Sequence, residues 1–296
     1  MKKWAKFFTV SLLGVVSACG SDAVEDELPA LPDNSQQQIT LTSRVVNSSF
    51  ENGDAIGVYV TNWENGAPSN LTAANNYVNN MKFTVNNAVW TSVTPIYWKD
   101  ANTTADFFGY YPYASVANAL AYKFQVKEAQ HQESNYKASD FLWGKKVGEK
   151  PSKARVDMML DHMMSKAVVK IAAGEGFTES ELDAAHVSVK FANVKNNAVI
   201  NLSNGVVKDE GNVVNISAYK VNNRTFEALM VPQHVNMTDL VIVNFNGSEY
   251  KLNRAMDFES RKQYTFTITL SKTSSGINVG IGSWDVVDSD FGGTVN

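Results

Sequence analysis

The chain of 296 residues contains one cysteine, Cys19, so it cannot form an intrachain disulfide. Its histidines, His131, His162, His186 and His234, show neither the H-x-x-x-H nor the H-E-x-x-H spacing of metal sites. The G-x-S-x-G, Walker and G-x-G-x-x-G motifs are also missing. The sequence therefore gives no support for an enzyme, a bound metal or a cofactor.

Charge is scarce as well. Charged residues make up 19% of the chain, and the formal net charge is -4. An acidic chain without a basic patch is not expected to bind nucleic acid. What the chain has in abundance is Asn and Ser, which suit turns, and Thr, Val and aromatic residues, which suit strands. This composition is typical of an exported all-β protein.

Only the N-terminus carries a long uncharged apolar run, "FFTVSLLGVV" at residues 7–16. Lys2, Lys3 and Lys6 precede this run, and small residues follow it. A basic region, a short apolar region and a small-residue end predict a secretory signal peptide over residues 1–18. The run is too short to span a bilayer, which needs roughly 20 residues.

The signal peptide ends on Val16-Ser17-Ala18-Cys19, which resembles the bacterial lipobox. The resemblance implies cleavage before Cys19 and attachment of lipid, including palmitate, to the sulfur and amine of that residue. The alternative is an ordinary signal peptide with a chance cysteine near its end. Residues 19–38 are acidic, contain two prolines and lack hydrophobic periodicity, so we expect a flexible tether.

From Ile39 onward the chain alternates apolar and polar residues in short runs separated by turn signals, which predicts antiparallel strands. The cleanest run is "QYTFTITLS", residues 263–271. Asn86-Asn87, Asn196-Asn197 and Asn246-Gly247 predict hairpin turns, because Asn and Gly tolerate positive φ. We expect two tandem antiparallel β-sandwich domains, at residues 39–175 and 176–296.

An aromatic-rich stretch, "YWKDANTTADFFGYYPYAS", begins at Tyr97. Seven aromatic residues fall between positions 97 and 113. They could stack against sugar rings on the surface. They could equally fill the core of a strand pair, and the alternation of "DFFGYYPY" favours this second interpretation.

Four segments follow one another along the chain in this order: "RVVNSSFENGDAIGVYV", the aromatic stretch, "DHMMSKAVVKI" and "RKQYTFTITLSKTSSGINVGIGSW". Together with the lipobox they resemble the fimbrillin family of Bacteroidota lipoproteins, which build type V pili. The resemblance implies Greek-key domains of the transthyretin type. It also implies that a protease removes the first strand of each subunit, and that a strand of a neighbouring subunit fills the groove.

Arg44 is the only Lys or Arg between Cys19 and Lys82, and it lies in the first expected strand. Cleavage after it would leave Val45 as the new N-terminus. An ordinary arginine on the polar face of a permanent strand is the alternative, and both readings stay open. The candidate donor strand carries Ile277, Val279 and Ile281, which alternate as strand addition requires.

The leading hypothesis is a structural subunit (stalk, tip or anchor) of a cell-surface fimbrium that serves adhesion. It would be attached to the outer membrane through lipid on Cys19. Its partners would be other pilus subunits by strand exchange, and a ligand on a host or bacterial surface. The alternative is a surface glycan-binding lipoprotein that uses residues 97–113, and a secreted hydrolase is the weakest option.

Overall fold

The structure, a computed structural model, describes residues 37–45, 48–153, 155–273 and 276–287. Within these residues it contains strands β1 to β17 and two six-residue helices, α1 (Glu133–Ala138) and α2 (Glu179–Ala184). The fold is therefore all-β, as the composition predicts. Neither described helix is long or apolar enough to cross a membrane.

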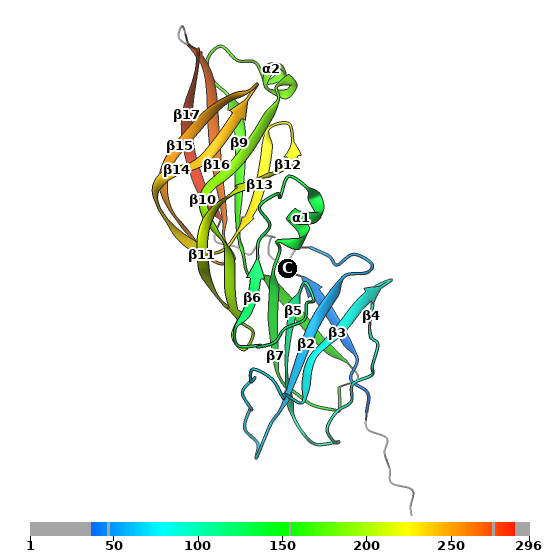
Figure 1. Ribbon diagram of the computed structural model, residues 1–296. Helices are drawn as coiled ribbons and strands as arrows, with labels where there is room; N and C mark the ends of the chain where they lie inside the picture. Colours follow the sequence, from blue (N-terminus) through cyan, green and yellow to red (C-terminus); the bar gives the residue numbers. More distant parts are fainter. Residues whose placement is uncertain (1–36, 46–47, 154, 274–275, 288–296) are drawn as a thin grey trace, which may run out of the picture. The chain divides into compact units, whose positions relative to one another are not determined.

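The first sheet has seven strands in the order β1-β8-β7-β5-β2-β3-β4, of which β7, β5, β2, β3 and β4 are labelled in Figure 1. In that order they are Leu41–Val45, Val156–His162, Leu142–Glu149, Ala105–Tyr111, Ala55–Asn62, Val78–Asn86 and Val89–Ser92. Every neighbouring pair is antiparallel except β1 and β8, which run parallel. Strands β1 and β4 are thus the two margins of the sheet.

These margins meet just before β1 and just after β4. The amide of Ile39 donates to the carbonyl oxygen of Ile96 at 2.9 Å, and that of Trp98 donates to the carbonyl oxygen of Gln37 at 3.0 Å. The sheet therefore encloses its own apolar core. Large buried side chains of that core are Ile39, Leu41, Val45, Ile56, Val58, Val60, Phe83, Trp90, Trp98, Phe107, Met158 and Leu160.

The other two sheets have five strands each and face each other. One contains β11 (Val206–Ser217), β10 (Val187–Asn201), β14 (Gln233–Phe245) and β15 (Ser248–Phe258), with β6 (Tyr122–Gln125) paired to β10. The other contains β12 (Tyr219–Asn222), β13 (Thr225–Met230), β9 (Ser165–Ala173), β16 (Gln263–Thr273) and β17 (Gly276–Val287).

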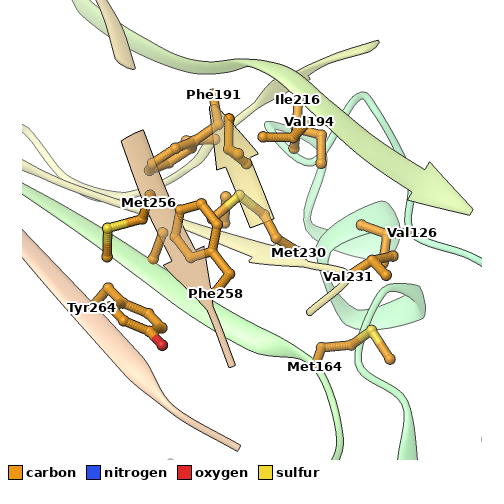
Figure 2. Packing of buried hydrophobic residues seen from close by; sticks show 14 of the residues in the cluster. Val126, Met164, Phe191, Val194, Ile216, Met230, Val231, Met256, Phe258 and Tyr264 are labelled. Atoms are coloured by element: carbon orange, nitrogen blue, oxygen red, sulfur yellow. The ribbon is translucent and has the colours of Figure 1, made fainter. Parts of the chain in front are cut away.

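A second, larger core fills the space between these sheets. The ring of Phe191 on β10 lies 6.1 Å, between centroids, from that of Phe266 on β16. Figure 2 shows Phe191, Met230, Met256, Phe258 and Tyr264 converging from several strands. This packing of two sheets across one core is a β-sandwich.

Strand β16 shows why the sequence pattern works. Tyr264, Phe266, Ile268 and Leu270 are almost fully buried, whereas the threonines between them are only partly buried. A period of two sends alternate side chains to opposite faces, so the apolar ones all reach the core. The prediction of a strand over this run is confirmed.

The hairpin predictions are confirmed at two positions and wrong at one. Asn87 joins β3 to β4 at a φ of 50°, and Asn246 joins β14 to β15 at the same φ. Asn196, by contrast, lies inside the continuous strand β10, where the pairing with β11 shifts register. Its side-chain amide donates to the carbonyl oxygen of Val126 at 3.2 Å, which gives a buried polar residue a partner inside the strand.

Two further features concern the pairing of strands, and the first departs from the expected antiparallel sheets. The sheets are not purely antiparallel, because β9 and β16 run parallel, as do β1 and β8. In addition, β6 and β9 come from residues 39–175 yet pair with strands from residues 176–296. These pairings cross residue 175, and the expected division into domains at residues 39–175 and 176–296 stays a prediction.

Candidate functional site at the first strand

Strand β1 has one buried face and one exposed face. Leu41 and Val45 are 3% and 7% exposed, and Ile39, just before the strand, is 2% exposed. Arg44 lies on the other face and is exposed to solvent. Removal of this segment would therefore take apolar side chains out of the core of the first sheet.

Strand β1 is held by β8 in parallel register, Leu41 opposite Val156 and Val45 opposite Leu160. On the outer face the hydroxyl of Thr42 donates to the carboxylate of Asp157. The Nε of Arg155 lies 3.1 Å from the same carboxylate. The hydrogen bond from Thr42, and then the charge of Arg155, hold the pKa of Asp157 below its ordinary value.

Arg44 is opposite Met159 in the register of β1 and β8, and both side chains are exposed. Among the described residues, the guanidinium of Arg44 has no ion-pair partner within 4.0 Å. A protease can reach this side chain, but its active site also needs the backbone. β1 pairs with β8 alone among the described strands, while the residues just before it are also held by the hydrogen bonds with Ile96 and Trp98, so a local opening has to break both sets of contacts.

A groove of about 580 Å³ lies beside β1. Its walls are residues 42–45 of β1, residues 48–50, the hairpin of β3 and β4, and the start of β8. The hydroxyl of Ser43, which lines the groove, is buried and has no hydrogen-bond partner among the described residues. The hydroxyl oxygen itself is closed to solvent, so the groove follows β1 without reaching it.

The candidate donor residues lie in β17, paired with β16 in the chain's own sheet. Ile277, Val279 and Ile281 are opposite Lys272, Leu270 and Ile268 of β16. Strand β17 ends the order of its sheet and pairs with one neighbour in the described part of the chain. Donation to another subunit would therefore require β17 to leave β16.

Cys19 and the tether at residues 19–36 lie outside the described residues. The structure therefore does not test lipid attachment to Cys19, which stays a prediction. Within the described ranges, no group of three or more His, Cys, Asp and Glu side chains is placed to hold a metal ion.

The aromatic stretch at residues 97–113 packs mainly inside the protein. Trp98, Phe107, Phe108 and Tyr110 are at most 2% exposed, while Tyr97 is 41% exposed. The hydroxyl of Tyr110 lies 2.6 Å from Oδ1 of Asn80, and burial raises the pKa of this phenol. This burial supports the core interpretation and removes most of the surface that sugar stacking would use.

Sequence reasoning found Arg44 but missed Thr42, Ser43 and Asp157. Ser43 had left a signal, because it is the one polar residue in the alternating apolar set of Ile39, Leu41 and Val45. Asp157 had left none, since its proximity to β1 depends on a parallel pairing between segments 115 residues apart.

Solved structures of other proteins share this all-β architecture. A crystal structure provisionally named a cell adhesion protein, from Bacteroides uniformis, superimposes with a TM-score of 0.67 at 23% identity and covers 87% of this chain and 99% of its own. Another so named, from Bacteroides ovatus, gives 0.67 at 16% identity, over 85% and 98%.

The family is shown by sequence. The fimbrillin-like family model matches residues 43–284, so the chain belongs to that family, as the order of its motifs indicated. A Bacteroides uniformis protein provisionally named fimbrium subunit Fim1C is 23% identical over 96% of both chains. Membership identifies the chain as a fimbrillin-like protein.

Proposed function

We propose that this chain is a lipid-anchored subunit of a fimbrium on the outer membrane, assembled by strand exchange at β1 and serving adhesion. The observation that carries the proposal is the position of β1. It is a marginal strand, bound by one neighbour, that covers the core with Leu41 and Val45 and exposes Arg44.

Cleavage after Arg44 would release Ile39 and Leu41 from the core. Full burial of one such side chain contributes about 1.5–3 kcal/mol, so the cut subunit would expose a substantial apolar slot. The edge of β8 would lose its partner at the same time. An uncovered strand edge above an apolar slot readily accepts another strand.

The incoming strand would be β17 of a neighbouring subunit. Its alternating residues Ile277, Val279 and Ile281 supply apolar side chains at the required spacing. A contact between the start of one subunit and the end of the next is head-to-tail, so it propagates as a filament rather than closing as a dimer. We also infer the two tandem Greek-key domains of the transthyretin type from the family resemblance.

Lipid on Cys19 would hold the subunit at the membrane before and during assembly. Multi-chain acylation gives stable attachment, because each buried methylene contributes about 0.8 kcal/mol. Cys19→Ala should therefore prevent lipid attachment and release the protein from the outer membrane. Normal outer-membrane levels of Cys19→Ala would contradict the anchor.

The test of strand exchange compares Arg44→Lys with the unmodified chain. The substitution keeps the positive charge on β1 but removes the target of an arginine-specific protease. We expect folded, full-length monomers that form no high-mass ladders with an arginine-specific protease, and restored ladders when trypsin replaces it. Lys82→Arg, which adds an arginine at the next basic position of the chain, is the control and should leave cleavage after residue 44 unchanged.

If Arg44→Lys still forms high-mass ladders when an arginine-specific protease is the only protease present, the proposal that the chain is cleaved after residue 44 is wrong. A subunit that keeps its first strand, such as an anchor or a tip, would then be the better assignment.

A further inference from the structure

The chain contains four Asn-Gly pairs, and each lies in a turn of the described structure. Their asparagines are Asn52, Asn65, Asn204 and Asn246. Asparagine is a thermolabile residue, and glycine has no side chain to shield the backbone amide beside it. The nitrogen of that amide can attack Cγ, the side-chain carbonyl carbon of the preceding asparagine. In a folded protein this attack depends on how firmly the two groups are held.

The pair Asn52-Gly53 is held at both reacting groups. Oδ1 of Asn52 accepts from the amide of Asn87 at 2.8 Å, and the amide of Gly53 donates to the carbonyl oxygen of Val85 at 2.8 Å. The first bond restrains the rotation that would bring Cγ of the asparagine to the backbone. The second engages the proton that the glycine amide has to lose. This pair is therefore protected twice.

The pair Asn204-Gly205 is held in the same way. Oδ1 of Asn204 accepts from the amide of Val206 at 3.0 Å, and the amide of Gly205 donates to the carbonyl oxygen of Asn201 at 2.8 Å. Gly205 is also buried and lies against the ring of Trp143. The backbone of this turn therefore has little room to rearrange.

The pair Asn246-Gly247 is exposed, yet both of its reacting groups are bonded. Oδ1 of Asn246 accepts from the amide of His186 at 2.9 Å, and the amide of Gly247 donates to Oδ1 of Asn244 at 3.0 Å. Exposure alone therefore does not separate the four pairs.

The pair Asn65-Gly66, in the connection between β2 and β3, has neither protection. Within the described part of the chain, the side chain of Asn65 and the amide of Gly66 have no hydrogen-bond partner, and both residues are exposed. A pair of hydrogen bonds between Glu64 and Ala67, each of 2.9 Å, closes the turn. This bridge lies outside the named strands, so a local opening breaks few contacts.

From this contrast we propose that Asn65 is a site of spontaneous deamidation in the folded chain. The nitrogen of Gly66 loses its proton to solvent and bonds to Cγ of Asn65, and the bond from Cγ to Nδ2 breaks with release of ammonia. One water molecule then opens the cyclic imide. Hydrolysis of its bond to Cγ gives aspartate, and hydrolysis of its bond to the backbone carbonyl carbon gives isoaspartate. Either product adds a negative charge next to Glu64. The proposal does not depend on strand exchange.

The experiment incubates the purified full chain in mildly alkaline buffer made with heavy-oxygen water, which labels the new carboxyl group. Peptide mapping with fragment-ion mass spectrometry follows the label at each asparagine. We expect Asn65 to react at least about tenfold faster than each of the other three. In urea the four should react at similar rates, because unfolding removes the hydrogen bonds that protect three of them.

Three results would overturn the proposal. Asn65 could remain unlabelled, or another of the four asparagines could react as fast as Asn65 in the folded chain. The same preference for Asn65 in urea would show that local sequence, rather than the fold, selects the site.

Two variants test the site and the reason for its selection. Asn65→Gln lengthens the side chain by one methylene and disfavours ring closure, so label at position 65 should fall to background; label that persists there would overturn the assignment. Asn244→Ala removes the acceptor for the amide of Gly247. It should accelerate labelling of Asn246 several-fold and leave Asn65 unchanged, with the melting temperature as the check on folding. An unchanged rate at Asn246 in the folded variant would overturn protection by hydrogen bonding, and with it the selection of Asn65.

Discussion

Strands β1 and β16 carry the same alternation of apolar and polar residues, yet they are held in different ways. β16 lies between β9 and β17 and buries Tyr264, Phe266, Ile268 and Leu270. β1 is half as long, has β8 on one side and the groove on the other, and places the polar Ser43 among its inward residues. A period of two reveals which face is buried, but not how many neighbours hold the strand.

This difference decides which strand contributes more to the stability of the fold and which one could be exchanged between subunits. A central strand cannot leave without breaking two ladders and opening the core of the sandwich. A marginal strand needs only one ladder to break, and the edge that it uncovers is a template for another strand. The predictions below measure how far the two strands differ.

The largest effect is expected for Phe266→Ala on β16. Loss of a buried phenylalanine leaves a cavity between facing sheets, so the free energy of unfolding should fall by about 3–5 kcal/mol. Urea denaturation measures the change. Thr267→Ala, on the partly exposed face of the same strand, is the matched control and should have a far smaller effect. Equal sensitivity at the two positions would mean that the faces are assigned incorrectly.

Leu41→Ala on β1 should have the next largest effect, a loss of about 2–3 kcal/mol, at the lower end for buried leucines because a marginal strand can relax into the cavity. The same variant should be cut faster after Arg44 by an arginine-specific protease, since local opening becomes easier. Denaturation and timed digestion report the two quantities. A loss as large as that of Phe266→Ala would show that β1 is held as firmly as β16.

Thr42→Val removes the hydrogen bond from β1 to Asp157 and keeps the size and branching of the side chain. Because both partners are partly exposed, we expect a loss of only about 1 kcal/mol. Digestion after Arg44 should again accelerate. Thr265→Val on β16 is the control. Faster digestion in that variant as well would show that the effect does not come from the contact between Thr42 and Asp157.

The smallest effect concerns pH. The pKa of Asp157 is lowered in the folded protein, first by the hydrogen bond from Thr42 and then by Arg155. Its stabilising contribution is therefore fully present above the ordinary pKa near 3.8 and is lost as pH falls through the lower, folded value. Digestion after Arg44 by an acid-tolerant protease should rise over that interval in the unmodified chain, and the rise should shrink in Asp157→Asn. Equal rises in both would exclude Asp157 as the cause.

The sequence alone predicts the parts of this fold that depend on local pattern. The alternation in β16, the turns at Asn87 and Asn246, and the Thr178 cap of α2 are all readable because the decisive residues are neighbours in the chain. In that cap, the side chain of Glu181 accepts from the amide of Thr178 at 2.8 Å.

What the sequence does not predict depends on distant pairing. β1 pairs with β8, and β9 with β16, in parallel register far along the chain, and no local pattern specifies a parallel partner. The error at Asn196 has the same origin, because the side-chain amide of this asparagine donates to the carbonyl oxygen of Val126, 70 positions away in the chain. Arg44 was found from its isolation in the sequence, whereas the groove beside it needed the fold.

The pairing of β1 with β8 also has a consequence for the order in which the chain folds. Thr42 and Asp157 are separated by 115 positions, so the first strand is synthesised long before its partner exists. Closing so long a loop is slow compared with forming the local hairpins, which places the docking of β1 late in folding. Until it docks, the edge that it will cover is open to competing strands from other nascent chains. Aggregation should therefore appear first among chains in which β8 has formed and β1 has not yet docked.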